Sequence, residues 1–477
     1  MSDTDLCYLS ASAAQALFRK RKLSPVELMQ AVIERAETVN RRINAFTFTH
    51  YDEAMDLARA AEAKFMSKSA RLGALEGLPI AIKDESWIAG KPTSYGSLLS
   101  KDTIATTTSA NNERIQKAGG IVHARTATPE FSCASFTHSR RWGVTRNPWN
   151  TRYTPGGSSG GSGASLAAGT APLAMGSDIG GSIRIPAGAS GVVGYKPPYG
   201  RNPDDAPFNL DPYCHTGPMA RSIQDAILLQ NVISGPSPAD IASLRPKLRL
   251  PTDYKPIKGW KIAYSLDLGF FDVDKDVIAN TKKALSVFRS LGATVEEVDL
   301  GWGPEVLRAG LEHLNHLFGT LMVGYAKKHR KVMTSYALRF AREAAKSTST
   351  KFLGSMDTAA KMYESFGPLM ERYDVFICPT NALPAVPADY DPAKGFRVNG
   401  KKSDLHPMLG WCMTTPFNTL SRCPVLSVPT GRATNGVPTG MQIVGRTYSD
   451  ADVFRAGLAY ETAIGGWYTD KRRRPAL

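Results

Sequence analysis

The sequence has no long apolar run and no apparent export signal. No stretch approaches the roughly 18 to 20 apolar residues of a membrane-spanning helix. Residues 1–7 read MSDTDLC and lack the basic-then-apolar order of a signal peptide. The 6 cysteines show no C-x-x-C spacing, which argues against both a disulfide framework and a structural zinc site. We therefore expect a cytoplasmic protein with reduced thiols, no membrane span and no metal.

Histidines and phosphate-binding motifs are also absent where the chain is richest in glycine and serine. The 8 histidines do not cluster there, and His313 and His316, three residues apart, lack the H-E-x-x-H order of a zinc helix. No G-x-x-x-x-G-K-[ST] motif occurs, and no lysine lies between Thr154 and Tyr195. A phosphate loop would lack its charged partner. We expect no organic cofactor.

The composition itself is that of a globular chain with a basic surplus. Hydrophobic residues make up 42% and charged residues 21%, which argues against a disordered or fibrous protein. The net charge of +15 raises nucleic acid, acidic membranes and anionic substrates as partners. However, residues 241–350 carry 18 Lys+Arg against 11 Asp+Glu, away from the segments discussed below. We assign the surplus to the surface and expect no nucleic-acid partner.

Apolar spacing predicts alternating helices and strands. Residues 24–27 (SPVE) are typical of a capping box with proline at the first helical position. Residues 78–83 (LPIAIK) predict a buried strand that ends in a lysine. Residues 261–298 predict a strand, a helix and a second strand, and short apolar runs at 373–378, 425–429 and 441–444 predict more strands. This order favours an α/β fold with a largely parallel or mixed sheet covered by helices.

The sheet must gather strands from distant parts of the chain, so we interpret residues 1–477 as a single large domain. Within it we expect N-terminal helices over 1–70 and a core with the catalytic motifs over 71–220. A long helical pattern over 303–372 predicts a helical insertion on the substrate side.

The most informative segment runs from 154 to 184 and contains TPGGSSGGS at 154–162 and GSDIGGSIR at 176–184. Consecutive glycines let several backbone N–H groups point at one position beside a hydroxyl. This layout suits an oxyanion hole, with the N–H groups of Ile179, Gly180, Gly181 and Ser182 as candidate donors. A tight structural turn remains an alternative. The G-x-S-x-G pattern at 156–160 would also fit an α/β-hydrolase with His406 as its later histidine.

A serine nucleophile needs a base, and Lys83 is the best candidate. A lysine at the end of a buried apolar strand is desolvated, which lowers its pKa and lets it accept a proton as a neutral amine. The alternative is that Lys83 simply extends from the strand end into solvent.

Three motifs, in this order, resemble the amidase signature family: GLPIAIKD at 77–84, PGGSSGG at 155–161 and DIGGSIR at 178–184. Ser158 and Ser182 are 24 positions apart. Further similar segments are NP at 147–148, GYKP at 194–197, DVFICPT at 374–380, PFN at 416–418 and GMQIVG at 440–445. The resemblance therefore covers most of the chain and is weakest over 303–372.

The resemblance implies a Ser-Ser-Lys triad. Ser182 would be the nucleophile, Ser158, whose peptide bond is cis in the family, would relay the proton, and Lys83 would be the base. Ser182 would attack an amide carbonyl, the oxyanion would bind residues 179–182, and water would hydrolyse the acyl-enzyme. Asp178 and Arg184 are interpreted as an internal polar brace of the loop.

The expected substrate is a small-molecule amide, either aryl, fatty or xenobiotic, with carbamates and esters as related substrates. The sequence does not choose among them and leaves a homodimer open. The candidate pocket walls are apolar side chains, namely Phe131, Trp142, Tyr213, Leu317, Met322, Trp411 and Cys412.

Two alternatives stay open. One is an assembly component that resembles the A-type chain of tRNA-dependent glutamine amidotransferases and works with partner chains on a tRNA-linked acid; the +15 charge would suit it. The other is a non-catalytic binding protein of the same fold, against which the presence of Lys83, Ser158 and Ser182 speaks.

Overall fold

The computed structural model describes residues 3–477. The strands are β1 (Phe46–Thr49), β2 (Pro79–Lys83), β3 (Ile121–Thr126), β4 (His138–Ser139), β5 (Gly143–Val144), β6 (Leu173–Asp178), β7 (Val193–Lys196), β8 (His215–Ala220), β9 (Lys261–Tyr264), β10 (Thr294–Glu297), β11 (Val375–Pro379), β12 (Arg397–Val398), β13 (Lys401–Lys402), β14 (Val425–Arg432) and β15 (Pro438–Val444).

The α-helices are α1 (Asp3–Cys7), α2 (Ala11–Arg19), α3 (Pro25–Ile43), α4 (Tyr51–Met66), α5 (Ala110–Lys117), α6 (Gly160–Ala168), α7 (Arg184–Ser190), α8 (Ile223–Ile233), α9 (Lys275–Ser290), α10 (Pro304–His316), α11 (Phe318–His329), α12 (Ser335–Ala344), α13 (Ser349–Met370), α14 (Pro416–Thr419) and α15 (Asp450–Ala463). Short 3-10 turns lie at Leu98–Ser100, Glu130–Ser132, Phe208–Leu210, Pro392–Lys394 and Lys471–Arg473.

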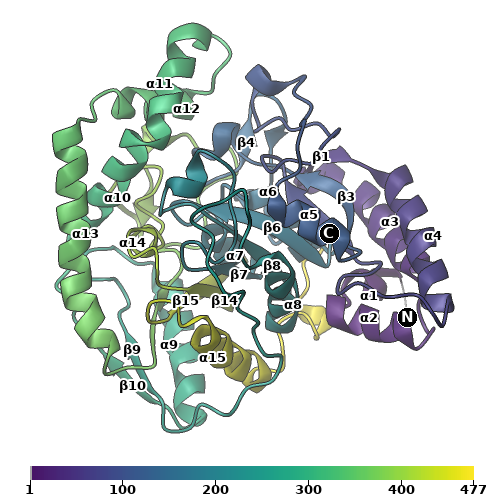
Figure 1. Cartoon of the computed structure of the whole chain (residues 1–477). Coiled ribbons are helices and arrows are strands. Elements are labelled where there is room, and N and C mark those ends of the chain that lie inside the picture. Colours follow the sequence, from purple (N-terminus) through teal and green to yellow (C-terminus); the bar gives the residue numbers. More distant parts are fainter. Residues whose placement is uncertain (1–2) are drawn as a thin grey trace.

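One 11-stranded sheet forms the centre of the molecule (Figure 1). Its strands lie in the order β1-β3-β2-β6-β8-β7-β14-β15-β11-β9-β10. β2 runs parallel to β3 and β6, whereas β8 runs antiparallel to β6 and β7. The prediction of a mixed sheet covered by helices is confirmed. The predicted strand–helix–strand unit is also present, because β9 and β10 pair in parallel and α9 connects them.

Successive side chains of β2 pack against helices on opposite faces of the sheet. Ile80 and Ile82 are fully buried in a cluster with side chains of α8, α9 and α15. Ala81, between them, lies in another cluster with the alanines of α6. Since successive side chains of a strand point to opposite faces, α6 lies on one face and α8 on the other. The face with α6 carries small residues, so its helix approaches the sheet closely.

Two groups of helices flank the sheet. α1–α4 lie on one side and α10–α13 on the other (Figure 1). α3 begins with the predicted capping box at Ser24 and Glu27. The N-terminal part is not purely helical, because β1 leaves this group of helices and pairs antiparallel with β3 at the edge of the sheet. The helices α10–α13 occupy the region predicted as a helical insertion.

The sheet topology brings the candidate motifs together. β2 and β6 are parallel neighbours, with Ile82 paired to Met175. β2 ends at Lys83 and β6 ends at Asp178, so the carboxyl ends of the two strands lie side by side. Ligand sites in sheets of this kind lie beyond the carboxyl ends of parallel strands.

Candidate active site

Lys83 is buried at the end of β2 and makes three polar contacts. Its Nζ lies 2.7 Å from Ser158 Oγ, 2.8 Å from Ser177 Oγ and 3.1 Å from a carboxylate oxygen of Glu85. Burial lowers the pKa of Lys83, and the negative charge of Glu85 opposes that effect. The alternative that Lys83 extends into solvent is wrong, because only 2% of its side chain is exposed.

The three contacts give a neutral Lys83 a defined orientation. A protonated amine can donate to all three partners. After loss of one proton, Ser177 and Glu85 still accept the two remaining N–H bonds, so the lone pair points towards Ser158 Oγ. The arrangement therefore suits Lys83 as an acceptor of a proton from Ser158.

Ser158 and Ser182 lie on two segments joined by a backbone hydrogen bond. The Gly157–Ser158 peptide bond is cis, as the resemblance predicts. The Ser159 N–H donates to the Ser182 carbonyl at 3.2 Å. Ser158 is buried and Ser182 is 7% exposed. Within residues 3–477 no hydrogen bond joins the two serine hydroxyls, so the relay between them stays a prediction.

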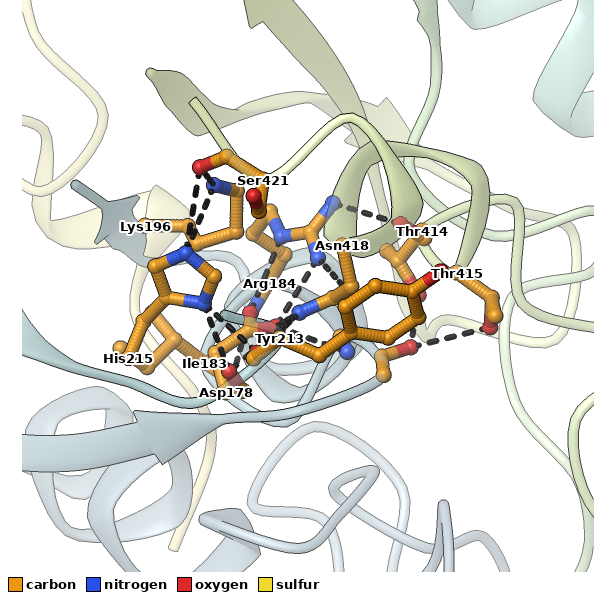
Figure 2. A network of polar contacts seen from close by, with 12 residues as sticks. Asp178, Ile183, Arg184, Lys196, Tyr213, His215, Thr414, Thr415, Asn418 and Ser421 are labelled. Carbon is orange, nitrogen blue, oxygen red and sulfur yellow. Dashed lines mark hydrogen bonds and ion pairs between the residues drawn. The ribbon is translucent and has the colours of Figure 1, made fainter. Parts of the chain in front are cut away.

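A buried ion pair holds the turn that carries Ser182. Arg184 Nη2 lies 2.9 Å from Asp178 Oδ1 and Arg184 Nε lies 2.9 Å from Asp178 Oδ2. Asn418 Nδ2 also donates to Asp178 Oδ1 at 2.8 Å (Figure 2). Burial would raise the pKa of Asp178, but Arg184 and Asn418 outweigh it and lower the pKa. Asp178 is thus a charged carboxylate with all its contacts internal, as expected of a brace.

The same brace changes the expected set of oxyanion donors. The Gly181 N–H donates to Asp178 Oδ1 at 2.8 Å and is therefore occupied. In the described part of the chain, the N–H groups of Ile179, Gly180 and Ser182 donate to no protein acceptor. The prediction of four free donors is corrected to three. Thr414 and Thr415 donate to the Gly180 carbonyl and hold the turn from its other side (Figure 2).

Gly181 is required by this packing. Its φ of +124° is one that residues with side chains rarely adopt. A Cβ at this position would lie 1.9 Å from Thr414 Oγ1. Gly180, the preceding residue, has no such restriction, because its Cβ would come no closer than 3.6 Å to any atom.

A second polar group lies behind the turn. His215, on β8, has Nδ1 close to the carbonyls of Tyr213 and Asp178, and Nε2 close to Lys196 (Figure 2). Burial lowers the pKa of His215 to about 3 and that of Lys196 to about 7. His215 is therefore a neutral ring whose nitrogens are already engaged, and we assign it a positioning role.

A cavity of about 360 Å³ opens beside Lys83 and Ser158. Lys83, Ser158 and Ile179 line it, together with Glu85 and Ser177. Aromatic side chains form much of the remaining wall, namely Trp87, Tyr95, Phe131, Phe208, Phe318 and Tyr325. The cavity thus joins Lys83 and Ser158 to a largely aromatic surface, whereas Ser182 is not among its lining residues.

The predicted wall residues divide between this cavity and the core. Phe131 and Met322 line the cavity, as expected. Trp411 and Cys412 do not, because both are fully buried in the core, where Trp411 Nε1 donates to Ser135 Oγ. Tyr213 also lies elsewhere, since its ring stacks on His313 with centroids 3.6 Å apart.

Trp142 and Leu317 complete the predicted set and are also absent from the cavity wall. Trp142 Nε1 donates to Ser94 Oγ, and Leu317 is 36% exposed at the junction of α10 and α11.

Two residues of the site were missed by the sequence reasoning. Ser177 precedes Asp178 in the glycine-rich motif, and Glu85 follows Lys83 by two positions. The position of Ser177 could have been expected, because residues next to the carboxyl ends of two neighbouring parallel strands lie close together. Nothing in the motifs themselves distinguishes Glu85 from a solvent-exposed carboxylate.

Comparisons with known proteins agree with this geometry. The family model described as Amidase matches residues 27–454. The chain belongs to the amidase family. It is 32% identical to an acylamidase of Rhodococcus erythropolis over 100% of this chain and 99% of the relative. It is 30% identical to the A-type chain of the glutamyl-tRNA(Gln) amidotransferase of Moorella thermoacetica, over 99% of both chains.

A solved structure supports the same family assignment. A bacterial aryl acylamidase of the amidase signature enzymes superposes with a TM-score of 0.88 at 31% identity, covering 96% of each chain. The family, the fold and the similarity to acylamidases indicate that this amidase is an enzyme that hydrolyses amides.

Proposed function

We propose that this amidase cleaves a small carboxamide through an acyl-enzyme on Ser182. Lys83 is the base, Ser158 passes the proton of Ser182 to it, and the N–H groups of Ile179, Gly180 and Ser182 bind the oxyanion. The observation that carries the proposal is the position of Lys83 Nζ, 2.7 Å from Ser158 Oγ, with its other two contacts occupied by Ser177 and Glu85.

The steps follow from this arrangement. Ser182 Oγ forms a bond to the amide carbon while its proton moves to Ser158 and that of Ser158 to Lys83. The tetrahedral intermediate collapses, the amine leaves with a proton returned along the same route, and an ester of Ser182 remains. Water, activated by the same groups, hydrolyses that ester and restores the serine. Each oxyanion donor typically contributes about 3 to 4 kcal/mol to such a transition state.

The aromatic wall of the cavity supports an aryl or similarly apolar amide as the substrate. The similarity to an acylamidase and to an aryl acylamidase points the same way. Carbamates and esters fit the same acyl chemistry.

A second candidate is supported by the similarity to the A-type amidotransferase chain, which extends over 99% of this chain. In that case the protein would act with partner chains. Hydrolysis of a simple aryl amide by this chain alone, without hydrolysis of glutamine, would favour the first proposal. Glutamine hydrolysis that appears only with partner chains would favour the second.

The location and assembly stay proposals. Within residues 3–477 the cysteines form no disulfide bond, and the proposed location is the cytoplasm, a reducing compartment. Of the helices within residues 3–477, none has the length and apolar character needed to cross a bilayer. The homodimer and the lack of a nucleic-acid partner also remain predictions.

The nucleophile is tested by labelling. The protein is treated with a fluorophosphonate, the intact mass is measured and the modified peptide is mapped. We expect one adduct on Ser182, no adduct in Ser182→Ala, and loss of 4-nitroacetanilide hydrolysis in that variant. An adduct on another residue, or full activity of Ser182→Ala, would overturn Ser182 as the nucleophile. Absence of any adduct and of any hydrolysis in the wild type would overturn the proposal and favour a binding protein of the same fold.

A further inference from the structure

One end of the cavity carries two adjacent carboxylates. Asp204 and Asp205 lie in the loop between β7 and β8, line the cavity and are partly buried. Among residues 3–477, no Lys, Arg or His side chain forms an ion pair with either of them. Asp204 Oδ1 accepts from the Asp205 N–H at 2.9 Å, and Asp205 accepts from the Ser109 hydroxyl. These contacts satisfy hydrogen bonds but leave the negative charges uncompensated.

A buried acceptor without a donor lies beside them. Asn111, on α5, lines the same cavity and is 3% exposed. Its Nδ2 donates to the Pro203 carbonyl at 2.8 Å, which fixes the orientation of the amide. Its Oδ1 is buried and has no hydrogen-bond partner among the described residues. A buried acceptor that lacks a donor is unfavourable, so the position is suited to a ligand that donates.

The other charged groups of the cavity do not compensate Asp204 and Asp205. Lys83 is the one Lys or Arg of the described cavity wall, and it already pairs with Glu85. His215 is neutral, and Asp178 pairs with Arg184. Burial raises the pKa of Asp204 to about 7, with further contributions from the charges of Asp205 and Glu85. The pKa of Asp205 is raised as well, first by burial and then by Asp240.

The aromatic walls complete the site. Phe208 follows Asp205 by three residues and packs edge-on against Phe318, with ring centroids 5.5 Å apart. Phe131 and Tyr325 stack at 4.8 Å. Aromatic faces attract organic cations, and carboxylates and an amide oxygen accept their N–H bonds. Within residues 3–477 no group of three His, Cys, Asp or Glu side chains is arranged to hold a metal ion.

We propose that Asp204, Asp205 and Asn111 form a subsite for a protonated amine carried by the amide substrate. This inference rests on the proposed function and names its substrate class: an amide with an apolar or aryl body and an ammonium group. Above the raised pKa values of Asp204 and Asp205, the same subsite rejects anionic amides, because a carboxylate would meet two like charges and an acceptor. The basic surplus of the whole chain therefore does not extend to its cavity.

Matched substrates test the subsite. One series is acetanilide with aminomethyl, ethyl or carboxylate as its para substituent. The second places an ammonium, methyl or carboxylate group at the far end of a short acyl chain on aniline. We expect kcat/KM for the cationic member to exceed that of the neutral member at least tenfold in one series. The anionic member should be the poorest in that series, and added salt should reduce the difference.

Variants assign the preference to these residues. Asp205→Asn and Asp204→Asn should each reduce the ratio of cationic to neutral kcat/KM about tenfold, and Asp205→Asn should improve the anionic member. Asp253→Asn, which removes an exposed carboxylate away from the cavity, should keep the wild-type ratio. Thermal unfolding of each variant checks that it folds.

Binding without turnover separates the two proposals. Calorimetry should detect benzylammonium binding to the wild type, binding about tenfold weaker to Asp205→Asn, and no binding of benzoate. Hydrolysis of neutral amides with no cationic preference in either series would overturn the subsite and leave the proposed function standing. Benzylammonium binding with no adduct at Ser182 and no hydrolysis would support the subsite as a binding site but overturn the proposed function. Absence of benzylammonium binding, or equal binding to Asp205→Asn, would refute the subsite.

Discussion

The charge of Glu85 should set the pH at which this amidase becomes active. Its carboxylate lies 3.1 Å from Lys83 Nζ, and both side chains are largely buried. Burial would raise the pKa of Glu85, but the Lys83 charge and hydrogen bonds from Ser132 and Ser177 lower it. Glu85 is therefore an anion that stabilises the protonated form of Lys83. Since the proposed base must be neutral, kcat/KM should rise with pH as Lys83 loses its proton.

Glu85→Gln removes that anion and retains the size of the side chain. Two unit charges 3.1 Å apart attract by about 1.3 kcal/mol in a medium as polar as water and by about 5 kcal/mol at an effective dielectric constant of about 20. At 1.36 kcal/mol per pKa unit, the pKa of Lys83 should fall by about 1 to 4 units. The sign is fixed, because loss of a negative neighbour always favours the neutral amine.

The measurement is kcat/KM against pH for a neutral aryl amide that does not ionise in the range used. The rising limb of the Glu85→Gln profile should move to lower pH by at least about one unit. Below the midpoint of the wild type, the variant should then be about tenfold faster for each pH unit that the limb moves, apart from any uniform loss of rate. Glu113→Gln is the matched control, because Glu113 pairs with Lys117 on the exposed face of α5. A limb that stays in place or moves to higher pH would refute the assignment of Lys83 as the base.

Two further predictions concern the turn and the core. Gly181→Ala should lose at least about a hundredfold in kcat, because its Cβ would meet Thr414 Oγ1 at 1.9 Å. Gly180→Ala should lose much less, because its Cβ would have no contact under 3.6 Å. Equal activities of the two variants would contradict the geometry of the turn. Trp411→Ala should lower the free energy of unfolding by about 3 to 5 kcal/mol, measured by denaturant titration, because Trp411 is fully buried in the core. KM of the folded Trp411→Ala protein should change little, and a large rise in KM with unchanged stability would return Trp411 to the pocket wall.

The sequence alone determined the class of fold and the chemical groups of the site. Short apolar runs and capped helices alternate strongly enough to predict a helix-covered sheet, because hydrophobic period and capping are local properties. The motifs around Lys83, Ser158 and Ser182 also predicted which residues to look for. Within residues 3–477 the structure then placed Lys83 beside Ser158, as the resemblance implied.

Only the tertiary structure decided which neighbours those groups have. Ser177 reaches Lys83 because β2 and β6 are parallel neighbours whose carboxyl ends lie together, a pairing across more than 90 positions of sequence. Glu85 reaches Lys83 through the tight turn that follows β2, in which the Glu85 N–H donates to the Lys83 carbonyl. The Gly181 N–H is taken by Asp178, which a motif cannot reveal. Trp411 and Phe131 are both apolar in sequence, yet one lies in the core and the other lines the cavity. The apolar character of a residue predicts that its side chain is buried. Packing between distant segments decides whether that side chain contacts the core or lines the cavity for a substrate.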